Sequence, residues 1–307
     1  MNAEASPSRA RQLYVRSRSR AFAIAKEVLY AAVRWSGAGW IARRASAGKV
    51  GIVLYHNPSP QTFAHHLRYL ARTSTFISLD NLVDAIERKD WSTIPPRSVV
   101  VTIDDGHADN RLLLELLARY RVRPTIYLCS QIVGTRRRYW WTAVGAHVRR
   151  ALSELPNGER LRRLRDEFGF SQTGENHVRH ALSWTEIGEM IEQVDFGAHT
   201  RFHPLLTQCE DAECRTEITG SRHELEELTG QPCRHFAYPN GVYGEREVAA
   251  VRDAGFASAR TTEIGLNNVE TDRYRLKILG IPDDASVNAL AAQLAAIPYL
   301  RDLIFLR

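Results

Sequence analysis

Two adjacent carboxylates are the residues of this chain that most plainly demand a chemical explanation. Asp104 and Asp105 directly follow the apolar run 98–103, which reads Ser-Val-Val-Val-Thr-Ile. Two neighbouring negative charges repel each other, and removing either from water is costly unless a positive charge compensates. We therefore expect either that both acids point into water or that a cation lies between them.

A pair of histidines further along the chain offers ligands for such a cation. His199 and His203 are four residues apart, and Pro204 disfavours an extended helix here, which leaves a loop or a single turn. Two histidines and one carboxylate supply three ligands for a divalent ion and leave positions open for water. One aspartate would then bind the ion, and its neighbour would act as general base. The alternatives are that an aspartate merely caps the following helix, or that the three ligands form the iron site of a non-haem oxygenase.

The elements that must position these side chains alternate between strand and helix. Short apolar segments at 49–57, 98–106, 123–129, 194–200, 235–239, 256–260 and 274–281 predict strands, with helical patterns between most of them. This alternation predicts an α/β fold in which about seven parallel strands form a distorted (β/α) barrel. Chemistry in such folds gathers at the carboxyl ends of the strands. The polar residues that follow the predicted strands are His56, Asp104, Asp105, His199 and Pro239–Gly241.

Two motifs on this frame resemble those of the polysaccharide deacetylase family, the NodB-homology domain of carbohydrate esterase family 4. The first motif is Thr102-Ile103-Asp104-Asp105-Gly106, and the second is His199-Thr200-Arg201-Phe202-His203-Pro204. The resemblance covers roughly residues 50–282. It implies that Asp104 is the catalytic base and that the ligands of a divalent metal, usually zinc, are Asp105, His199 and His203. It also implies hydrolysis of the N-acetyl group of an amino sugar in a poly-, oligo- or lipid-linked saccharide, with release of acetate.

The third motif of the family is altered in this chain. The segment Arg-His-Phe-Ala-Tyr-Pro-Asn-Gly stands where many members have Arg-x-x-Pro-Tyr. Pro239 keeps its place, and Asn240 occupies the position whose backbone N–H would help to hold the oxyanion, a role independent of side-chain identity. Arg234 lies two positions too early for the arginine that orients the base, so no residue is assigned to that role.

The general acid also departs from the family pattern. The last predicted strand, 274–281, contains no histidine, although the family usually has Leu-x-His there. His56 ends the first predicted strand, and the first and last strands of a closed barrel are neighbours. We therefore predict His56 as the general acid; the alternative is a buried structural histidine beneath the site. Aromatic residues that could stack on sugar rings, or instead pack in the core, are Tyr139, Trp140, Trp141 and Tyr238.

Charge and pattern divide the chain into three parts. Residues 1–49 hold ten Lys or Arg and two acidic residues, a net charge of +8, whereas the rest of the chain has a net charge of −2. We predict a basic, partly disordered arm at 1–49, a catalytic barrel at 50–282 with an insertion at about 135–182, and a helical tail at 283–307. The four cysteines form no CxxC pair and are predicted to be reduced structural thiols.

The arm has a helical pattern over residues 21–42, with apolar Ile24, Val28, Ala31 and Trp35 on one side. Its three charged residues argue against a transmembrane span, and it makes a poor secretory signal. It could lie on an anionic membrane surface or pack on the domain. Nucleic-acid binding is not expected, and the predicted location is cytoplasmic, at the inner membrane surface. Two alternatives to the predicted function stay open: a non-catalytic carbohydrate-binding relative, and a deacylase of a non-carbohydrate amide.

Overall fold

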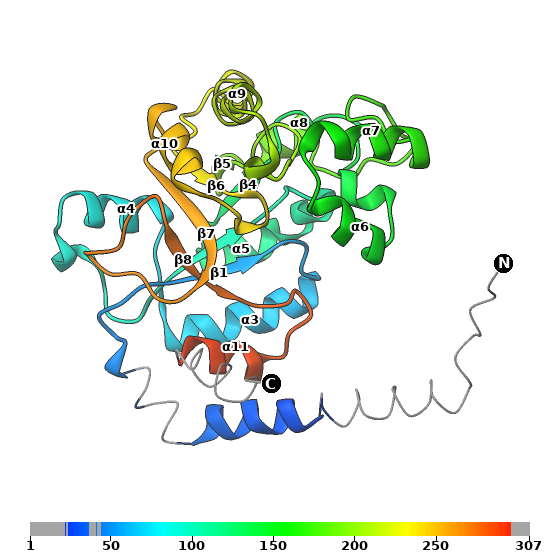
Figure 1. Cartoon of the computed structure of the whole chain (residues 1–307). Helices are drawn as coiled ribbons and strands as arrows, with labels where there is room; N and C mark the ends of the chain where they lie inside the picture. The colour runs from blue at the N-terminus through cyan, green and yellow to red at the C-terminus, as the bar shows by residue number, and fades with distance from the viewer. Residues whose placement is uncertain (1–21, 23, 37–40, 42–43, 296–307) are drawn as a thin grey trace, which may run out of the picture.

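Parallel strands close into a barrel surrounded by helices (Figure 1). The computed structural model describes residues 22, 24–36, 41 and 44–295. The barrel order is β1 (Gly51–Tyr55), β8 (Leu276–Gly280), β7 (Ser258–Ile264), β6 (His235–Ala237), β5 (Asp195–Ala198), β4 (Thr125–Leu128) and β3 (Ser98–Ile103). The short strand β2 (Thr75–Phe76) adds to the outside of β3. The predicted barrel of about seven parallel strands is confirmed.

Closure of the barrel depends on β1, which pairs with strands on both of its sides. Its register against β3 runs from Gly51 opposite Val99 to Tyr55 opposite Ile103. On the other side, Val53 lies opposite Leu279 of β8. The first and last strands are therefore neighbours, as the placement of His56 as general acid requires.

The strands are buried on both faces, which explains their continuous apolar sequences. All residues of β1 and β3 are buried. Alternate residues of β1 enter different clusters: Val53 and Tyr55 pack with Phe63, whereas Ile52 and Leu54 pack in a second cluster. This period of two is the expected consequence of strand geometry.

Helices cover the barrel from outside. They are α3 (Pro60–Thr73), α4 (Leu79–Glu87), α5 (Leu114–Tyr120), α8 (Trp184–Met190), α9 (Asp211–Thr229), α10 (Glu245–Asp253) and α11 (Val287–Leu294). Local sequence sets several of their starts: Ser59 caps α3 before Pro60, and the Ser183 and Glu186 side chains form a capping box at α8.

The segment 135–182 has a small apolar core of its own. It contains the 3₁₀ turn η3 (Trp140–Ala143) and the helices α6 (Ala146–Ser153) and α7 (Asn157–Phe168). The buried residues of this core are Trp140, Leu152, Leu164 and Phe170. The segment also pairs with the loop after β3, where Leu182 N–H donates to the Gly106 carbonyl. This pairing places the segment beside the end of β3.

The ends of the chain are described only in part. The predicted disorder of residues 1–20 and most of the predicted tail after α11 lie outside the described residues. Within the arm, residues 24–35 are helical. All four cysteines are buried and none is paired in a disulfide, in agreement with a structural role.

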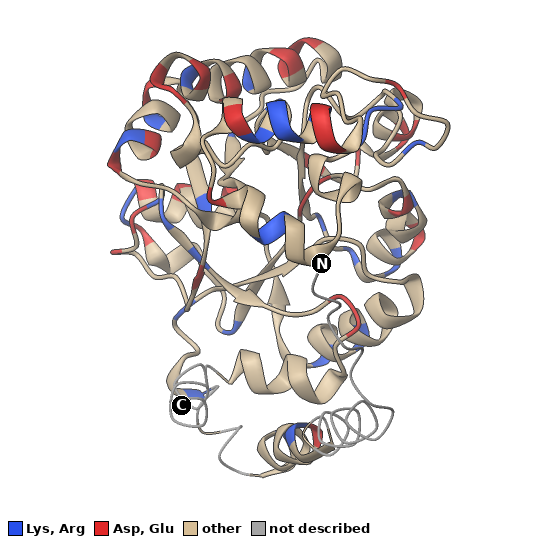
Figure 2. Cartoon of the chain, turned by 45° about the vertical axis from the view of Figure 1, so that its right-hand side comes forward, with Lys and Arg blue, Asp and Glu red and all other residues tan. Residues whose placement is uncertain are grey.

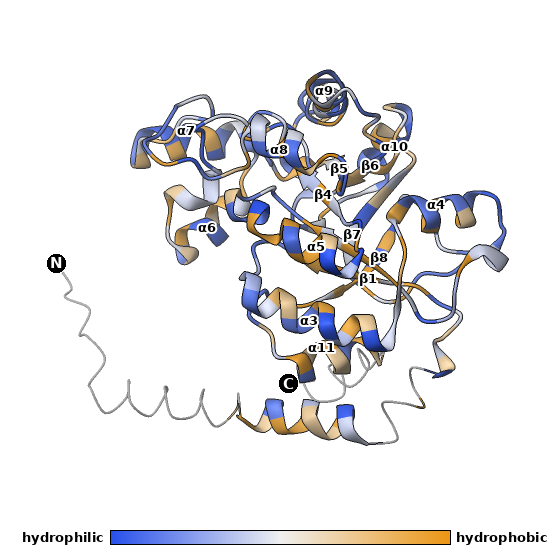
Figure 3. Ribbon diagram, turned by 180° about the vertical axis from the view of Figure 1, so that it is seen from behind, coloured by the Kyte–Doolittle hydropathy of each residue, from blue (hydrophilic) through white to orange (hydrophobic). Residues whose placement is uncertain are grey.

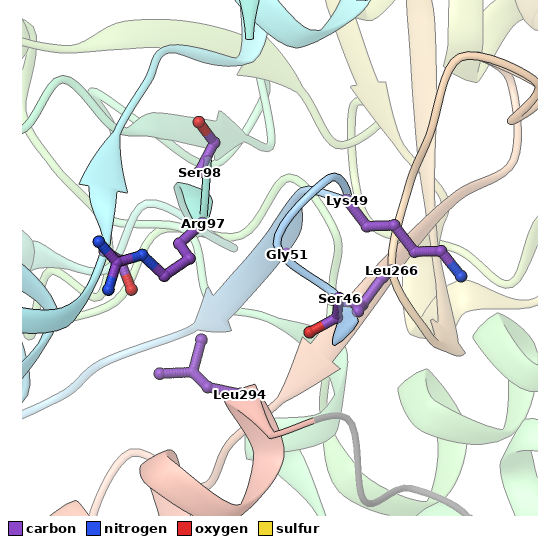
Figure 4. A pocket seen from close by; sticks show the side chains of 8 residues that line it. Ser46, Lys49, Gly51, Arg97, Ser98, Leu266 and Leu294 are labelled. Atoms are coloured by element: carbon purple, nitrogen blue, oxygen red, sulfur yellow. The ribbon is translucent and has the colours of Figure 1, made fainter. Parts of the chain in front are cut away.

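A small pocket lies at the amino ends of the strands (Figure 4). Gly51 and Ser98, which begin β1 and β3, line it together with Lys49 and Arg97. Its cavity volume of about 30 Å³ is small. The chemistry-bearing residues lie at the opposite ends of the strands.

Candidate active site

The turn after β3 directs both aspartates to the mouth of the barrel. Asp104 N–H still pairs with the Tyr55 carbonyl at 2.9 Å, so the sheet register extends to Asp104. Asp105 and Gly106 then adopt left-handed conformations, with φ of 70° and 63°. A left-handed non-glycine residue is uncommon and is found at functional sites. This turn lets two consecutive side chains reach a common site.

Asp105, His199 and His203 converge in the geometry of a metal site. Nε2 of His199 and Nε2 of His203 are 3.1 Å apart, and they lie 3.8 and 3.6 Å from Asp105 Oδ1. Ligands bound tetrahedrally to one zinc ion at about 2.0–2.1 Å are separated by about 3.3 Å. The three side chains are buried, and Asp105 Oδ1 has no hydrogen-bond partner within the described part of the chain. A buried, unpartnered carboxylate oxygen beside two imidazole nitrogens fits a bound divalent cation.

Neighbouring groups fix the orientation of each ligand. His199 Nδ1 donates to the Ala237 carbonyl at the end of β6, 2.7 Å away, which leaves the Nε2 lone pair for a metal. His203 is held through its backbone: its N–H donates to Thr200 Oγ1, and its carbonyl accepts from Trp140 Nε1. Three residues that the sequence argument did not assign to this role therefore support the site, namely Thr200, Ala237 and Trp140.

A third histidine, His107, supports Asp105. His107 Nε2 lies 3.3 Å from Asp105 Oδ2, the oxygen that does not face the two ligand histidines. The Tyr139 hydroxyl donates to the Asp105 carbonyl. Sequence reasoning missed His107, although its position directly after Asp-Asp-Gly was a usable signal. The two carboxylate oxygens of Asp105 are thus divided between a metal site and a supporting imidazole.

Burial and neighbouring charges favour the metal-binding protonation forms of His203 and Asp105. Burial, together with the adjacent His199, lowers the pKa of His203 to about 3, so its ring is neutral at pH 7. Burial alone would raise the pKa of Asp105, but the hydrogen bond from His107 and the two ligand histidines lower it well below its usual range. A neutral imidazole and an ionised carboxylate are the forms of these two residues that bind a metal.

Asp104 is held by an arginine that the sequence did not reveal. Arg260 of β7 is fully buried, and its Nη2 donates to Asp104 Oδ2. Its Nη1 donates to the Thr261 carbonyl at 2.9 Å, which fixes the guanidinium. Asp104 Oδ1 is buried and has no hydrogen-bond partner among the described residues. One oxygen of Asp104 is therefore anchored while the other is left to accept a proton.

Arg234, the only arginine near the third motif, does not orient the base. It forms ion pairs with Asp80 and Asp84 of α4. The role that the sequence left unassigned falls to Arg260 of β7. Arg260 is the single charged residue of the predicted strand 256–260, Phe-Ala-Ser-Ala-Arg, and that charge was the available sequence signal.

The Asp104–Arg260 pair yields a prediction on stability. Arg260→Met leaves the Asp104 carboxylate buried and unpaired, so we expect the free energy of unfolding to fall by about 3–5 kcal/mol. Combining it with Asp104→Asn removes the stranded charge and should recover most of the loss. Urea unfolding of wild type, both single variants and the double variant measures this coupling. Simply additive losses would show that the two residues do not act as a pair.

His56 lies at the mouth with an exposed imidazole. Its backbone N–H and that of Asn57 donate to the two oxygens of Asp283, at 2.9 and 2.8 Å, and its carbonyl accepts from Asn110 Nδ2. The alternative of a buried structural histidine is wrong, because the residue is exposed. The turn at His56 is therefore fixed by Asp283, which follows β8, and by Asn110, which follows β3. The role of His56 as general acid stays a prediction.

The predicted substrate residues separate into buried and accessible ones. Trp141 is half-buried; its ring meets the His203 ring edge-on at 4.4 Å and stacks on Tyr139 at 4.6 Å. Direct sugar contact by Tyr238 is wrong, because Tyr238 is 1% exposed and its hydroxyl donates to the Tyr274 carbonyl. Tyr139 and Trp140 are buried in the same way. Trp141 is the remaining aromatic candidate.

The Pro239–Gly241 turn follows the Ala237 carbonyl that holds His199. Pro239 is buried, so it shapes the turn and does not contact a saccharide. Asn240 is exposed and left-handed, with φ of 54°, and Gly241 follows with φ of 67°. The turn therefore places exposed Asn240 three residues after the carbonyl that holds His199.

Comparison with known proteins identifies the family. The family model described as polysaccharide deacetylase matches residues 92–259, more than half of the chain. The chain belongs to this family, whose members are hydrolases acting on N-acetyl amide bonds, and the resemblance drawn from the motifs is confirmed. His56 and Arg260 both lie outside the matched range. A search of curated proteins found no match.

Solved structures share the fold at low sequence identity. The deacetylase PplD of Streptococcus pyogenes, in complex with acetate, is 18% identical, with a TM-score of 0.61 over 80% of this chain and 98% of that one. IcaB from Ammonifex degensii is 18% identical, with a TM-score of 0.57 over 81% and 96%. The de-N-acetylase from Aggregatibacter actinomycetemcomitans is 15% identical, with a TM-score of 0.57 over 80% and 99%.

Proposed function

We propose that this chain is a divalent-metal-dependent deacetylase that removes N-acetyl groups from amino sugars of a poly-, oligo- or lipid-linked saccharide. The observation that carries the proposal is the unpartnered Oδ1 of buried Asp105 beside two imidazole Nε2 atoms. Asp104, the residue directly before Asp105, also has an unpartnered oxygen, Oδ1. The other oxygen of Asp104, Oδ2, is 3.9 Å from His199 Nε2. Ligand atoms and a free carboxylate at one site are the requirements of metal-assisted hydrolysis.

Each residue has a definite task in this mechanism. A bound zinc ion, held by Asp105, His199 and His203, would polarise the N-acetyl carbonyl and acidify water. Asp104 accepts a proton as water attacks the carbonyl carbon, and Arg260 holds its carboxylate in place. The Asn240 backbone N–H donates to the developing oxyanion. His56, protonated, donates a proton to the leaving amine, and acetate is released.

The fold excludes one competing function and leaves two to experiment. The iron oxygenase alternative is wrong, because the ligands belong to a parallel (β/α) barrel of the deacetylase family. A non-catalytic carbohydrate-binding relative would not need the unpartnered Asp104 oxygen or the buried Arg260 that holds Asp104. A deacylase of another amide would keep the same catalytic residues and would differ only in substrate.

Acetate release is the direct test of the proposed function. We expect release from a panel of N-acetylhexosamine oligosaccharides and lipid-linked N-acetyl sugars, because the catalytic groups act on the shared acetamide. A chelator should abolish it, and added zinc should restore it. A second panel of non-carbohydrate acetamides tests whether the enzyme requires a sugar. Binding of the saccharides without acetate release would favour the non-catalytic relative, and release from the other amides alone would overturn the saccharide assignment.

A further inference from the structure

The arm helix, residues 24–35, contacts the domain through two polar side chains, Glu27 and Arg34. The Glu27 carboxylate accepts hydrogen bonds from Ser286 Oγ at 2.8 Å and Asn288 Nδ2 at 2.7 Å, at the start of α11. Arg34 Nη1 donates to Asn288 Oδ1 at 2.9 Å, and its guanidinium lies over the Tyr69 ring of α3. These contacts fix which side of the helix faces outward.

The outward side of this helix is apolar. Ile24, Val28 and Trp35 occupy one face and are 65%, 64% and 76% exposed. Phe22 and Leu29, 54% and 38% exposed, extend the surface. Figure 3 shows a mostly apolar helix at the edge of the molecule, and Figure 2 shows few charged residues on it. A helix packed on a soluble domain normally has the opposite arrangement, so this apolar face marks an interaction surface.

The charges around the helix identify the partner. Residues 1–49 hold ten Lys or Arg and two acids, and one of those acids, Glu27, is bound to α11. Trp and Phe on an apolar face with basic flanks are characteristic of a helix lying at the headgroup boundary of an anionic bilayer. None of the described helices combines the length and apolar character of a membrane-spanning segment.

We propose that the arm helix docks the protein on an anionic lipid bilayer, with Ile24, Val28 and Trp35 inserted among the lipids and the helix axis along the surface. Because α11 and α3 hold the opposite side of the helix, docking also orients the barrel relative to the bilayer. The helix α9 lies at the far side of the molecule (Figures 1 and 3). The proposal is independent of the deacetylase chemistry.

Vesicle flotation of the full chain tests the proposal. We expect the protein to float with vesicles of mixed phosphatidylcholine and phosphatidylglycerol more than with phosphatidylcholine alone, and less as salt rises. The double variant Val28→Glu/Trp35→Glu should weaken partitioning at least about tenfold. Leu228→Glu, at a residue of α9 that is 49% exposed, is the matched control and should float like wild type. Unchanged thermal unfolding midpoints verify that both variants are folded.

Two further measurements make the outcome decisive. Bromine-labelled phosphatidylglycerol should quench the tryptophan fluorescence of wild type more than that of Trp35→Phe. Sedimentation without vesicles should show a monomer. The proposal is overturned if wild type does not float, or if the double glutamate variant floats equally well. A dimer that this variant dissociates, without flotation of wild type, would assign the apolar face to a second copy of the chain.

Discussion

Asp104→Asn should lower turnover by about 100- to 10,000-fold while the protein still binds one metal ion, because an amide cannot accept the proton from the attacking water. The three metal ligands are untouched by the change, and the asparagine oxygen can still accept a hydrogen bond from Arg260. The measurement is the rate of acetate release, together with the zinc content of the purified variant.

A second carboxylate separates the loss of a base from a general effect of charge. Asp253→Asn removes an exposed carboxylate at the end of α10, and this variant should release acetate at the wild-type rate. The assignment of Asp104 as base fails if Asp104→Asn keeps full turnover. If the variant loses its metal as well, Asp104 would be a ligand.

The second large effect is expected for the metal ligands. His203→Ala removes one of three clustered ligand atoms and should weaken zinc binding by more than about 100-fold, with loss of acetate release. Competition with a fluorescent zinc chelator measures the affinity without reference to activity. His65→Ala, an exposed histidine of α3, is the matched control and should bind zinc like wild type.

His107 gives a graded version of the same experiment. Its ring supports Asp105 Oδ2 without facing the ligand cluster, so His107→Ala should weaken zinc binding about 10- to 100-fold. We therefore expect the zinc affinity to be highest for wild type, lower for His107→Ala and lowest for His203→Ala. Equal affinity of all three proteins would contradict a metal site at these residues.

Much of the fold and of the metal site could be predicted because the information is local. Apolar strands ending at polar residues specified a parallel barrel, since such strands are buried on both faces and their carboxyl ends meet. The ligands come from two short motifs, Asp104–Asp105 and His199–His203, in which chain connectivity holds the reactive groups near one another. The left-handed turns at Asp105 and His203 then bring the side chains of the two motifs to one site.

The partners of these residues could not be predicted in the same way. Arg260 pairs with Asp104 across 156 positions of sequence. Arg234, which begins the altered third motif, instead forms an ion pair with Asp80 of α4. Which arginine reaches the site depends on the register of β7 in the closed barrel. Likewise, Trp141 and Tyr238 have similar character in the sequence, but only the fold buries the second.

The sequence by itself determined the barrel, the family and the three side chains that cluster at the candidate metal site, because these follow from periodicity and from residues close together in the chain. It also determined that the arm would be an amphipathic helix. Only the tertiary structure decided which face of that helix is exposed, through the contacts of Glu27 and Arg34 with α11. It also decided which arginine holds the base. The physical reason is that burial and pairing are set by contacts between distant segments, which local patterns do not encode.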